Sequence, residues 1–406
     1  MEDVVSEVIK KALGESKIFK NREALACDYI PNRLPHREEY IRKTAELLSP
    51  VLRGEKPSNI FLYGLTGTGK TAVVKYVIKR FTEHAEKAGI DFFKFSYVNC
   101  RNEDTNYRVL FKVGSDIGAK IPFTGLSVAE LHNRLREYVE SKRMIVTIVL
   151  DEVDFLVKKV GDDLLYRLTR INDELYRSKV SIIGITNDVK FVETLDPRVK
   201  SSLGEVEVVF PPYDALQLAD ILRERAVLAF RENVLDSGVI EYCASVAARE
   251  HGDARRALDL LRFAGEIAER ESALKVTIEH AKKAREELEV NAATEVVRTL
   301  PYHSKLILLS LATRGGFAES TGSLYLAYRK ICDILGLEPL AQRRVSELIS
   351  ELDMLGILTS KVISRGRYGK TKEIALGIDS TVILKVLSSD TRIGEYVKLL
   401  KNDRNR

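Results

Sequence analysis

Short apolar runs rich in β-branched residues alternate with longer helix-like segments through the first half of the chain. The strand-like runs lie at 60–62, 92–100 and 180–186, with another that ends at Asp151 and Glu152. Strands that alternate with helices are typical of a parallel sheet covered by helices on both faces. The pattern therefore predicts an α/β domain with a parallel sheet over residues 1–210. Between Asn102 and Arg143 the helical section is longer than such a minimal fold needs.

A helical spacing of apolar residues replaces the strand pattern from about residue 211 to 295. The first apolar stripe comprises Leu216, Ala219, Ile221, Leu222 and Ala226, and the second Val239, Tyr242, Ala244, Val246 and Ala247. These stripes predict a small helical domain over 211–295 beside the sheet. Such a domain can close on a bound ligand and relax after the reaction.

The remaining residues, 296–406, predict a third domain. Helix-like segments lie at 305–312, 323–335 and 341–358, and 360–378 has the pattern of a strand, a glycine turn and a second strand. The helix at 341–358 has an apolar stripe, interpreted as core, that comprises Val345, Leu348, Ile349, Leu352 and Leu355. This order of elements is the outline of a winged helix, a fold that is typical of DNA-binding domains.

The segment YGLTGTGKTAVV, 63–74, has the spacing of a phosphate-binding loop between a strand and a helix. Glycines allow a tight turn whose N–H groups point at phosphate oxygens, and the following helix directs its positive dipole end there. The predicted nucleotide-binding residues are Gly64, Thr66, Gly67, Thr68, Gly69, Lys70, Thr71 and Ala72. Lys70 would contact the β- and γ-phosphates, and Thr71 would bind Mg²⁺. The alternative is a glycine-rich turn with no ligand.

Polar side chains end two of the predicted strands, where the carboxyl ends of a parallel sheet gather chemistry. Asp151 is predicted to hold Mg²⁺, mainly through water, and Glu152 to polarise the attacking water. Asn187, which ends the next strand, is predicted to lie near the γ-phosphate, although a turn-capping asparagine has the same pattern. These residues predict an ATPase that takes ATP or ADP with Mg²⁺.

The composition indicates where the protein is located in the cell and shows an uneven distribution of charge along the chain. No apolar stretch approaches the length of a membrane span, and the acidic N-terminus does not fit a signal peptide. The four cysteines lie far apart, which is typical of reduced thiols, so we expect a cytoplasmic protein without a membrane partner. Residues 301–406 contain 17 Lys and Arg against 11 Asp and Glu, whereas the rest contains 47 against 48. This basic excess indicates a polyanionic partner for the C-terminal domain, or else a solvated basic face.

The ordered motifs GLTGTGKT, IVLDEVD, ITND, LDPRVKSSL and GDARRALDLL resemble those of AAA+ ATPases. More specifically, they resemble the archaeal replication initiators related to the eukaryotic origin-recognition complex and its helicase-loading cofactor. The resemblance includes YIPNRLPHREEYI, 29–41, and FPPYDALQLADILRERA, and it covers nearly the whole chain. It implies an AAA+ base, a helical lid and a C-terminal winged helix.

The resemblance also assigns roles to individual residues. Arg255 resembles the lid arginine that touches the γ-phosphate, with Arg256 as the neighbouring candidate. Arg198 resembles the arginine finger that completes a partner molecule's active site, and would be an ordinary surface residue in a monomer. The residues implied beside the adenine are Tyr213, Arg225, Pro31, Leu34 and Arg37.

Two surfaces are candidates for DNA contact. In the winged helix these are Gln342, Arg343 and Arg344 at a helix start, and Arg365, Arg367, Tyr368 and Lys370 around the glycine turn. A solvated helix face in which Arg343 pairs with Glu347 is the alternative for the first group. The family resemblance further implies a DNA contact at Lys120, Phe123 and Thr124, where a surface loop before a helix capped by Ser127 is an equal alternative.

The sequence therefore predicts ATP-controlled, sequence-specific binding of double-stranded DNA at replication origins. It further predicts recruitment of the replicative helicase, association with other initiator subunits, location at the nucleoid, and slow hydrolysis that acts as a switch. A motor or clamp loader on DNA is one alternative, and it would need sustained turnover and a stable ring. A transcription regulator is another, and its footprints would be confined to promoters.

Overall fold

The computed structural model describes residues 16–364 and 370–397 of the 406-residue chain. Its contacts divide the chain after Ala281 into two compact units, and each has a hydrophobic core of its own. No helix in these described ranges is long and apolar enough to cross a membrane.

The first unit contains a five-stranded parallel sheet in the order β2-β3-β4-β1-β5. Its strands are β1 (Asn59–Tyr63), β2 (Phe93–Asn99), β3 (Ile145–Asp151), β4 (Lys179–Thr186) and β5 (Glu205–Val209). Every residue of β1 and β3 is buried, because helices cover both faces of the sheet. The sheet confirms the predicted α/β fold.

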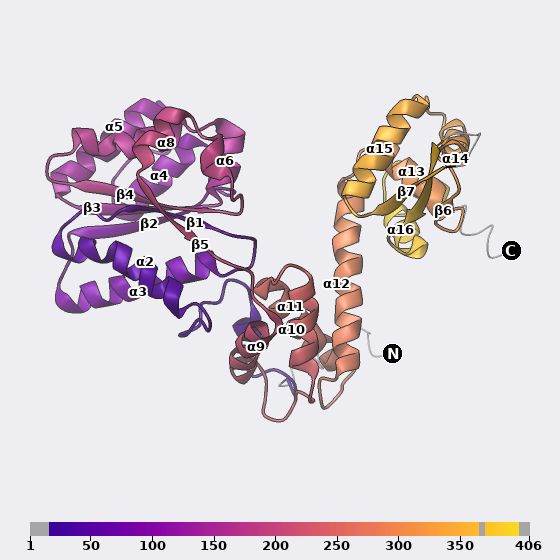
Figure 1. Cartoon of the computed structure of the whole chain (residues 1–406), viewed down its shortest axis with the longest axis horizontal. Helices are drawn as coiled ribbons and strands as arrows, with labels where there is room; N and C mark the ends of the chain where they lie inside the picture. Colours follow the sequence, from indigo (N-terminus) through magenta and orange to yellow (C-terminus); the bar gives the residue numbers. More distant parts are fainter. Residues whose placement is uncertain (1–15, 365–369, 398–406) are drawn as a thin grey trace, which may run out of the picture. The chain divides into compact units, whose positions relative to one another are not determined.

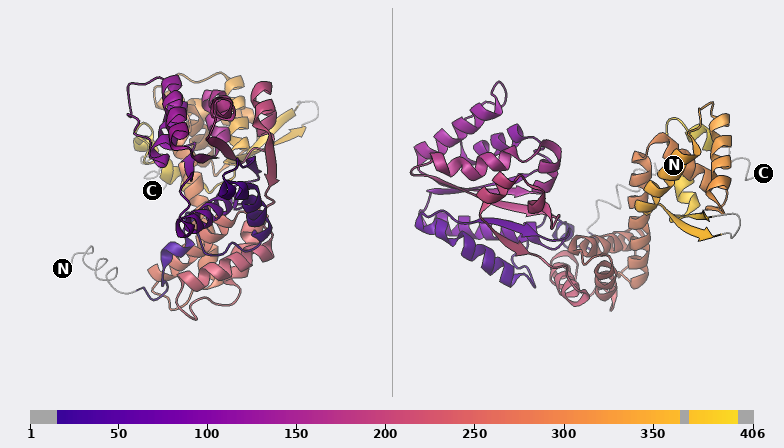
Figure 2. Two further views of the ribbon diagram at one scale, coloured as in Figure 1. Left: turned by 90° about the vertical axis from the view of Figure 1, so that its left-hand side faces the viewer. Right: turned by 45° about the horizontal axis from the view of Figure 1, so that its top comes forward.

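Two helical layers enclose this sheet (Figure 1). One layer consists of α2 (Glu38–Leu48) and α3 (Lys70–Ala88), with the 3₁₀ helix η2 (Ser49–Arg53). The other contains α4 (Asn106–Ile117), α5 (Val128–Lys142), α6 (Val153–Val160), α7 (Asp163–Arg170) and α8 (Pro197–Leu203), with η3 (Ile171–Glu174) and η4 (Phe191–Thr194). The turned views in Figure 2 show the same sandwich of helices around the sheet.

A helical lid completes the first unit, with α9 (Ala215–Ala229), α10 (Val239–Arg249) and α11 (Ala254–Arg270). The Asp214 carboxylate accepts a hydrogen bond from the Gln217 N–H, and the Gln217 Oε1 accepts one from the Asp214 N–H, a capping box that starts α9. The predicted stripe of α9 is wrong at Leu216, which is 80% exposed. The buried face contains Leu218, Leu222 and Ala226 instead, and at about 3.6 residues per turn Leu216 lies away from that face.

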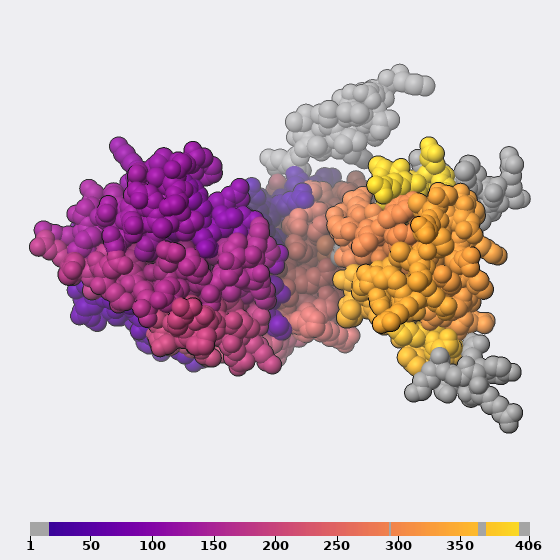
Figure 3. Space-filling view, turned by 90° about the horizontal axis from the view of Figure 1, so that it is seen from above, coloured from indigo at the N-terminus to yellow at the C-terminus, as the bar shows by residue number. Residues whose placement is uncertain are grey.

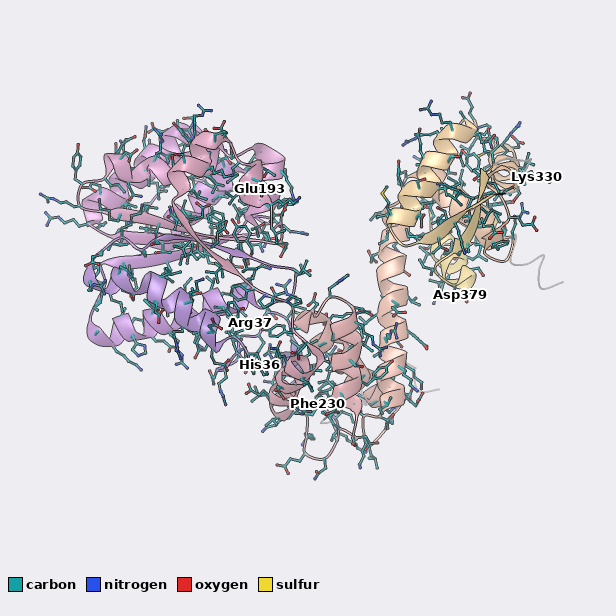
Figure 4. All side chains as sticks on the ribbon, in the orientation of Figure 1. His36, Arg37, Glu193, Phe230, Lys330 and Asp379 are labelled. Carbon is teal, nitrogen blue, oxygen red and sulfur yellow. The ribbon has the colours of Figure 1, made fainter. Side chains whose placement is uncertain are left out.

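The first described residues pack on this lid. The rings of Phe19 and Phe230 stack with centroids 4.9 Å apart, and the Lys20 N–H donates to the Ala229 carbonyl over 2.8 Å. η1 (Arg22–Leu25) follows and buries Ala24 and Leu25. Phe230 is labelled in Figure 4, and Figure 3 shows indigo N-terminal residues beside the salmon residues of the lid.

Helix α12 (Ile278–Thr299) leads into the second unit, which has a winged-helix fold. Its helices are α13 (Tyr302–Ala312), α14 (Thr321–Ile334), α15 (Gln342–Met354) and α16 (Ser380–Leu387). They pack with a three-stranded antiparallel sheet, β6-β8-β7, made of β6 (Phe317–Ala318), β7 (Leu358–Ser364) and β8 (Lys370–Leu376).

The core of this unit differs from its prediction at one residue. Val345, Leu348, Ile349 and Leu352 of α15 are buried as expected, but Leu355 is 54% exposed. The helix ends at Met354, so Leu355 leaves the helical stripe and the chain turns through Gly356 toward β7. The prediction of Leu355 as a core residue is therefore wrong.

Candidate functional site

The phosphate-loop sequence connects β1 to α3 at the carboxyl edge of the sheet. Gly64, Gly67 and Gly69 all have positive φ angles, of 147°, 70° and 89°. At Gly67 the lid adds a second constraint, because a Cβ there would lie 1.7 Å from an Asp253 carboxylate oxygen. Glycine is therefore needed here for the backbone angle and for the close approach of the lid.

Lys70 is the buried cation of the loop, with 5% of its surface exposed. Its ammonium donates to the carbonyls of Gly64 over 2.7 Å and Leu65 over 2.8 Å, and to Asn187 Oδ1 over 3.0 Å. These acceptors are neutral, and burial lowers the Lys70 pKa to about 8. An anion beside this group would reverse much of that shift, as expected of a phosphate-binding lysine.

Thr71 and Asp151 bring a hydroxyl and a carboxylate together beside the loop. The Thr71 hydroxyl donates to Asp151 Oδ2 over 2.9 Å, and Asp151 is 4% exposed at the end of β3. Parallel register places Asn99 of β2 opposite Asp151. Oxygen ligands that are held in place at the end of a strand fit a magnesium ion with its water ligands.

Glu152 follows directly, in a left-handed backbone conformation with φ of 56°. Its carboxylate receives Arg101 Nε at 2.9 Å, and the Arg101 side chain is 63% exposed. Non-glycine residues with this conformation are uncommon and cluster at functional sites. A carboxylate paired with an exposed arginine can be released to act on water.

A cavity of about 530 Å³ contains these groups, within the usual range for a small-molecule site. Thr66, Gly67, Thr68, Gly69, Lys70, Thr71 and Ala72 line it, together with Asp151, Glu152, Asn187 and Arg255. Gly64 does not line the cavity, although its carbonyl accepts from Lys70. The structure thus brings together residues that are predicted from four separate segments.

The same cavity is also lined by the residues implied beside the adenine: Pro31, Leu34, Arg37, Tyr213 and Arg225. Arg37 donates to the carbonyls of Thr68, His36 and Pro211, and its guanidinium lies 3.6 Å from the Tyr213 ring centroid. It therefore links the phosphate loop to the start of the lid, and Figure 4 labels both His36 and Arg37 there.

Arg225 is buried, and it lines the cavity beside Tyr29. Its Nη2 donates to the Tyr29 carbonyl over 3.0 Å, and its guanidinium lies 4.8 Å from the Tyr29 ring centroid. Within the described ranges its buried Nη1 has no hydrogen-bond partner. Burial lowers the Arg225 pKa, and a hydrogen-bond acceptor on a ligand would compensate part of that cost.

The two lid arginines point to different surroundings. Asp253 caps α11 by accepting from the N–H groups of Arg255 and Arg256, and the Ala254 N–H donates to the Gly67 carbonyl over 3.2 Å. Arg255 lines the cavity, whereas Arg256 Nε donates to Glu250 Oε2 over 2.9 Å. The geometry favours Arg255 as the residue that contacts a nucleotide.

We expect Arg255→Ala to bring the ATP and ADP affinities closer together and to slow hydrolysis, because a guanidinium near the γ-phosphate distinguishes the two nucleotides. A lost charge-assisted hydrogen bond is worth about 1.5–3 kcal/mol, roughly a 10- to 150-fold loss of ATP affinity. Titration with labelled ATP and ADP measures both constants. Arg256→Ala is the matched control, and a larger effect in that variant would move the role to Arg256.

Arg198 does not line the cavity of its own chain. It lies in the first turn of α8, where its guanidinium bonds to Asp196 over 3.1 and 3.2 Å, and the side chain is 74% exposed. Tyr166 supports it, with its ring centroid 5.8 Å from the guanidinium carbon. An exposed arginine outside the cavity can reach a nucleotide only in another molecule.

Four residues that lie beside Asp151, Glu152 or the phosphate loop were missed by sequence reasoning: Tyr97, Asn99, Arg101 and Asp253. Tyr97 and Asn99 stand at the end of a predicted strand, so the rule that located Asp151 and Asn187 could have found them. Arg101 and Asp253 have no comparable signal, because their contacts join segments far apart in the sequence.

The predicted DNA-binding residues at the start of α15 are exposed. The Arg343 side chain is 94% exposed, while Arg344 donates to Glu347 over 2.8 Å and lies 3.5 Å from Glu351. The alternative pairing of Arg343 with Glu347 is also present, at a longer 3.6 Å. A shallow groove contains Arg343, Arg344, Ser346, Glu347, Ser350, Glu351 and Lys372, and Gln342 begins the helix beside it.

The other DNA candidates lie in two ranges of the sequence, 120–124 and 365–370. Lys120, Phe123 and Thr124 are exposed between α4 and α5, and the Phe123 ring packs edge-on against Phe111 with centroids 4.9 Å apart. Ser127 caps α5 as expected by accepting from the Glu130 N–H. Arg365, Arg367 and Tyr368 lie outside the described residues, and Lys370 begins β8.

Models of three protein-domain families match the chain in order. Residues 53–188 match the AAA domain, 219–286 the Cdc6 AAA+ ATPase-type lid domain, and 295–386 the CDC6, C terminal winged helix domain. These matches agree with the sheet, the lid and the winged helix described above.

Similar proteins span nearly the same length. ORC1-type DNA replication protein 1 of Sulfurisphaera tokodaii is 55% identical over 399 residues, covering 97% of this chain and 98% of that protein. ORC1-type DNA replication protein 1 of Aeropyrum pernix is 56% identical over 390 residues, covering 95% and 98%. The structure of the Aeropyrum pernix ORC1 protein in complex with DNA matches with a TM-score of 0.80 at 55% identity, covering 94% of this chain and 100% of that one.

These relatives share more than half of their residues with the chain over 94–97% of its length. Together with the phosphate loop, the lid and the winged helix, this identity places the chain in the archaeal ORC1-type family of DNA replication proteins, which are AAA+ ATPases.

Proposed function

We propose that the protein binds double-stranded DNA at replication origins in a sequence-specific and ATP-regulated manner, and that it initiates DNA replication there. The observation that carries the proposal is the likeness over 94% of the chain to the Aeropyrum pernix ORC1 protein in complex with DNA. The exposed arginines of α15 and the basic C-terminal composition support the same partner. The protein would then act in the cytoplasm, at the nucleoid.

The protein would act through three domains: the AAA+ domain at 1–210, the lid at 211–295 and the winged helix at 296–406. In the AAA+ domain, Lys70 would neutralise the β- and γ-phosphates, and the loop N–H groups would bind the remaining phosphate oxygens. The adenine of ATP or ADP would be surrounded by another group of residues that line the cavity: Tyr213, Arg225, Pro31, Leu34 and Arg37.

Magnesium belongs beside Thr71 and Asp151, whose side-chain oxygens already lie 2.9 Å apart. When bound, the ion would neutralise charge on the β- and γ-phosphates. The protein's part is to hold the hydroxyl and the carboxylate in one place before the nucleotide arrives.

Hydrolysis would use Glu152 to polarise water and Asn187, which bonds to Lys70, to orient groups near the γ-phosphate. Arg198 would act on the nucleotide of a neighbouring initiator subunit, because its exposed side chain lies outside its own cavity. Slow hydrolysis then follows for an isolated molecule, and ATP acts as a switch more than as a fuel.

The lid would report the nucleotide state through Arg255. Its helix α11 already touches the phosphate loop through Ala254 and Asp253, so a change at the γ-phosphate can move the lid directly. We propose that the ATP state favours origin binding and recruitment of the replicative helicase, and that hydrolysis resets the assembly.

The experiment that tests this function is genome-wide mapping of binding sites, combined with footprints on the mapped sequences in ATP and in ADP. We expect sites at replication origins, footprints that differ between the nucleotides, and capture of the replicative helicase with the ATP form. Sites confined to promoters, without helicase, would contradict it.

In the winged helix we expect the two groups of basic residues to respond differently to mutation. Arg343→Ala should cost about 1–3 kcal/mol on the cognate site and relax preference at one base pair, if its exposed guanidinium contacts a base edge. Arg344→Ala should cost less, because Glu347 and Glu351 already hold that side chain. Arg367→Ala and Lys370→Ala should weaken binding to cognate and scrambled duplexes alike. Each change should lower the slope of log affinity against log salt concentration by about one unit.

Binding measured across a salt series on both duplexes separates these cases. Lys385→Ala, on an exposed position of α16, is the matched control for the loss of one positive charge. Equal effects of all four changes on the two duplexes would contradict base contact by α15. A chain ending before Pro301 that binds cognate DNA as tightly as the full chain would contradict the winged-helix assignment altogether, whereas weaker but specific binding would point to Lys120, Phe123 and Thr124.

A further inference from the structure

Asp151 accepts a second hydrogen bond that the proposed ATPase roles do not use. The Tyr97 hydroxyl donates to Asp151 Oδ2 over 2.6 Å, and the same oxygen accepts from the Thr71 hydroxyl over 2.9 Å. Short O–H···O⁻ bonds of this length are charge-assisted and stronger than neutral ones. Two donors on one carboxylate oxygen fix both the position and the plane of the group.

The fold brings Tyr97 to this position through the parallel register of β2 and β3. Asn99 lies opposite Asp151, and Tyr97 precedes Asn99 by two residues, so both side chains project from the same face of β2. That face packs under α3, which supplies Thr71 in its first turn. The tyrosine hydroxyl therefore approaches the carboxylate from the sheet side, while Thr71 approaches it from the helix.

Lys75 fixes the tyrosine ring in turn. It lies one helical turn after Thr71 on α3, and its ammonium is 4.3 Å from the Tyr97 ring centroid. A cation over an aromatic face is attracted to the ring and restricts its tilt. Lys75 lines the nucleotide cavity, whereas Tyr97 lies behind Asp151 and does not.

We propose that Tyr97 is a positioning residue of the magnesium site, which holds the Asp151 carboxylate in the orientation that the metal and its waters require. The proposal rests on the proposed role of Thr71 and Asp151 in binding Mg²⁺. Groups that hydrogen-bond to metal-binding carboxylates tune affinity without touching the metal, and their loss typically costs about 10- to 100-fold. Tyr97 does so from an edge strand of the sheet, outside the motifs that contain the ligands.

The test separates this role from a merely structural hydrogen bond. Binding of a fluorescent ADP analogue is measured in EDTA and across a Mg²⁺ series, for the wild type and for Tyr97→Phe. We expect unchanged affinity in EDTA and about a 10- to 100-fold higher Mg²⁺ concentration for the half-maximal metal effect. A Ca²⁺ series should show a smaller shift, because calcium accepts flexible geometry whereas magnesium requires near-ideal octahedral ligands.

Tyr63→Phe is the matched control. Tyr63 is a buried tyrosine of β1 in the same sheet, and within the described ranges its hydroxyl has no hydrogen-bond partner. Removal of the Tyr63 hydroxyl should leave every metal titration unchanged. The EDTA measurement also reports folding, since a misfolded variant would lose metal-free binding.

Each other outcome overturns the proposal. The Mg²⁺ concentration for the half-maximal effect could lie within twofold of the same value for Tyr97→Phe, the wild type and Tyr63→Phe. That result would contradict this inference but not the magnesium assignment. Equal losses in EDTA, Mg²⁺ and Ca²⁺ would make Tyr97 a structural residue. A wild-type protein whose nucleotide affinity does not respond to Mg²⁺ would contradict the magnesium assignment itself, and with it this inference.

Discussion

Lys70→Ala is expected to abolish measurable nucleotide binding. Lys70 is the buried cation of the phosphate loop, and its hydrogen-bond partners are the neutral oxygens of Gly64, Leu65 and Asn187. Removing one partner of a buried charged pair costs about 2–5 kcal/mol, roughly a 30- to 5,000-fold loss of affinity. Titration with a fluorescent ATP analogue measures the effect.

Lys79→Ala is the matched control for this change, because Lys79 lies on the same helix with 56% of its side chain exposed. It should bind nucleotide as the wild type does. A circular dichroism spectrum distinguishes lost binding from lost structure. A folded Lys70→Ala protein that keeps nucleotide affinity within threefold of the wild type would remove Lys70 from the site.

The pH dependence of binding provides an independent check on Lys70. Burial lowers its pKa to about 8, so the free protein loses the ammonium proton as the pH rises through that value. The phosphates favour the charged form and raise the pKa in the complex, so affinity should fall by up to about tenfold per pH unit above pH 8. Lys70→Arg should show a flat profile over the same range, whatever its absolute affinity, because a guanidinium stays protonated. Parallel profiles for the two proteins would contradict this account.

Glu152→Gln is expected to stop hydrolysis and to leave nucleotide binding intact. The change keeps the shape of the side chain but removes the negative charge that polarises water, and loss of a general base costs about 10²- to 10⁴-fold in rate. Phosphate release under single-turnover conditions measures the rate, and titration with ATP measures the affinity.

Glu193→Gln is the control for Glu152→Gln. Glu193 is an exposed residue of η4 that does not line the cavity, and it is labelled in Figure 4. The Arg101 partner sharpens the interpretation, since Glu152→Gln also breaks the ion pair at 2.9 Å. Arg101→Gln alone should therefore not reproduce the block. Equal loss of affinity and rate in Glu152→Gln would contradict the separation of binding from chemistry.

Much of the site was predictable from the sequence because its parts are local. The phosphate loop needs glycines at three backbone angles and a lysine and threonine at the start of the next helix, and all of these lie within eight residues. Asp151 and Asn187 were predicted by the rule that parallel strands end at one edge, which requires only that the strands be recognised. The winged-helix outline follows in the same way from the order of its elements.

Burial at the ends of helices was less predictable. Leu216 and Leu355 continue an apolar spacing, yet they are 80% and 54% exposed. Periodicity predicts an apolar face of a helix, but the neighbouring elements decide which face is covered and where the helix ends. The covered face of α9 contains Leu218, Leu222 and Ala226 rather than Leu216, and Leu355 follows the end of α15.

By itself, the sequence determined the class of fold, the phosphate loop and the acidic strand end, because each is encoded by neighbouring residues and by the period of the apolar pattern. Only the tertiary structure separated the surroundings of Arg255 and Arg256, since adjacent residues on a helix point in different directions and Arg255, unlike Arg256, lines the cavity. It also placed Tyr97 on Asp151 and Asp253 against Gly67. Such contacts join strands, helices and loops that are distant in sequence, and no local pattern encodes which hydroxyl or carboxylate will meet which partner.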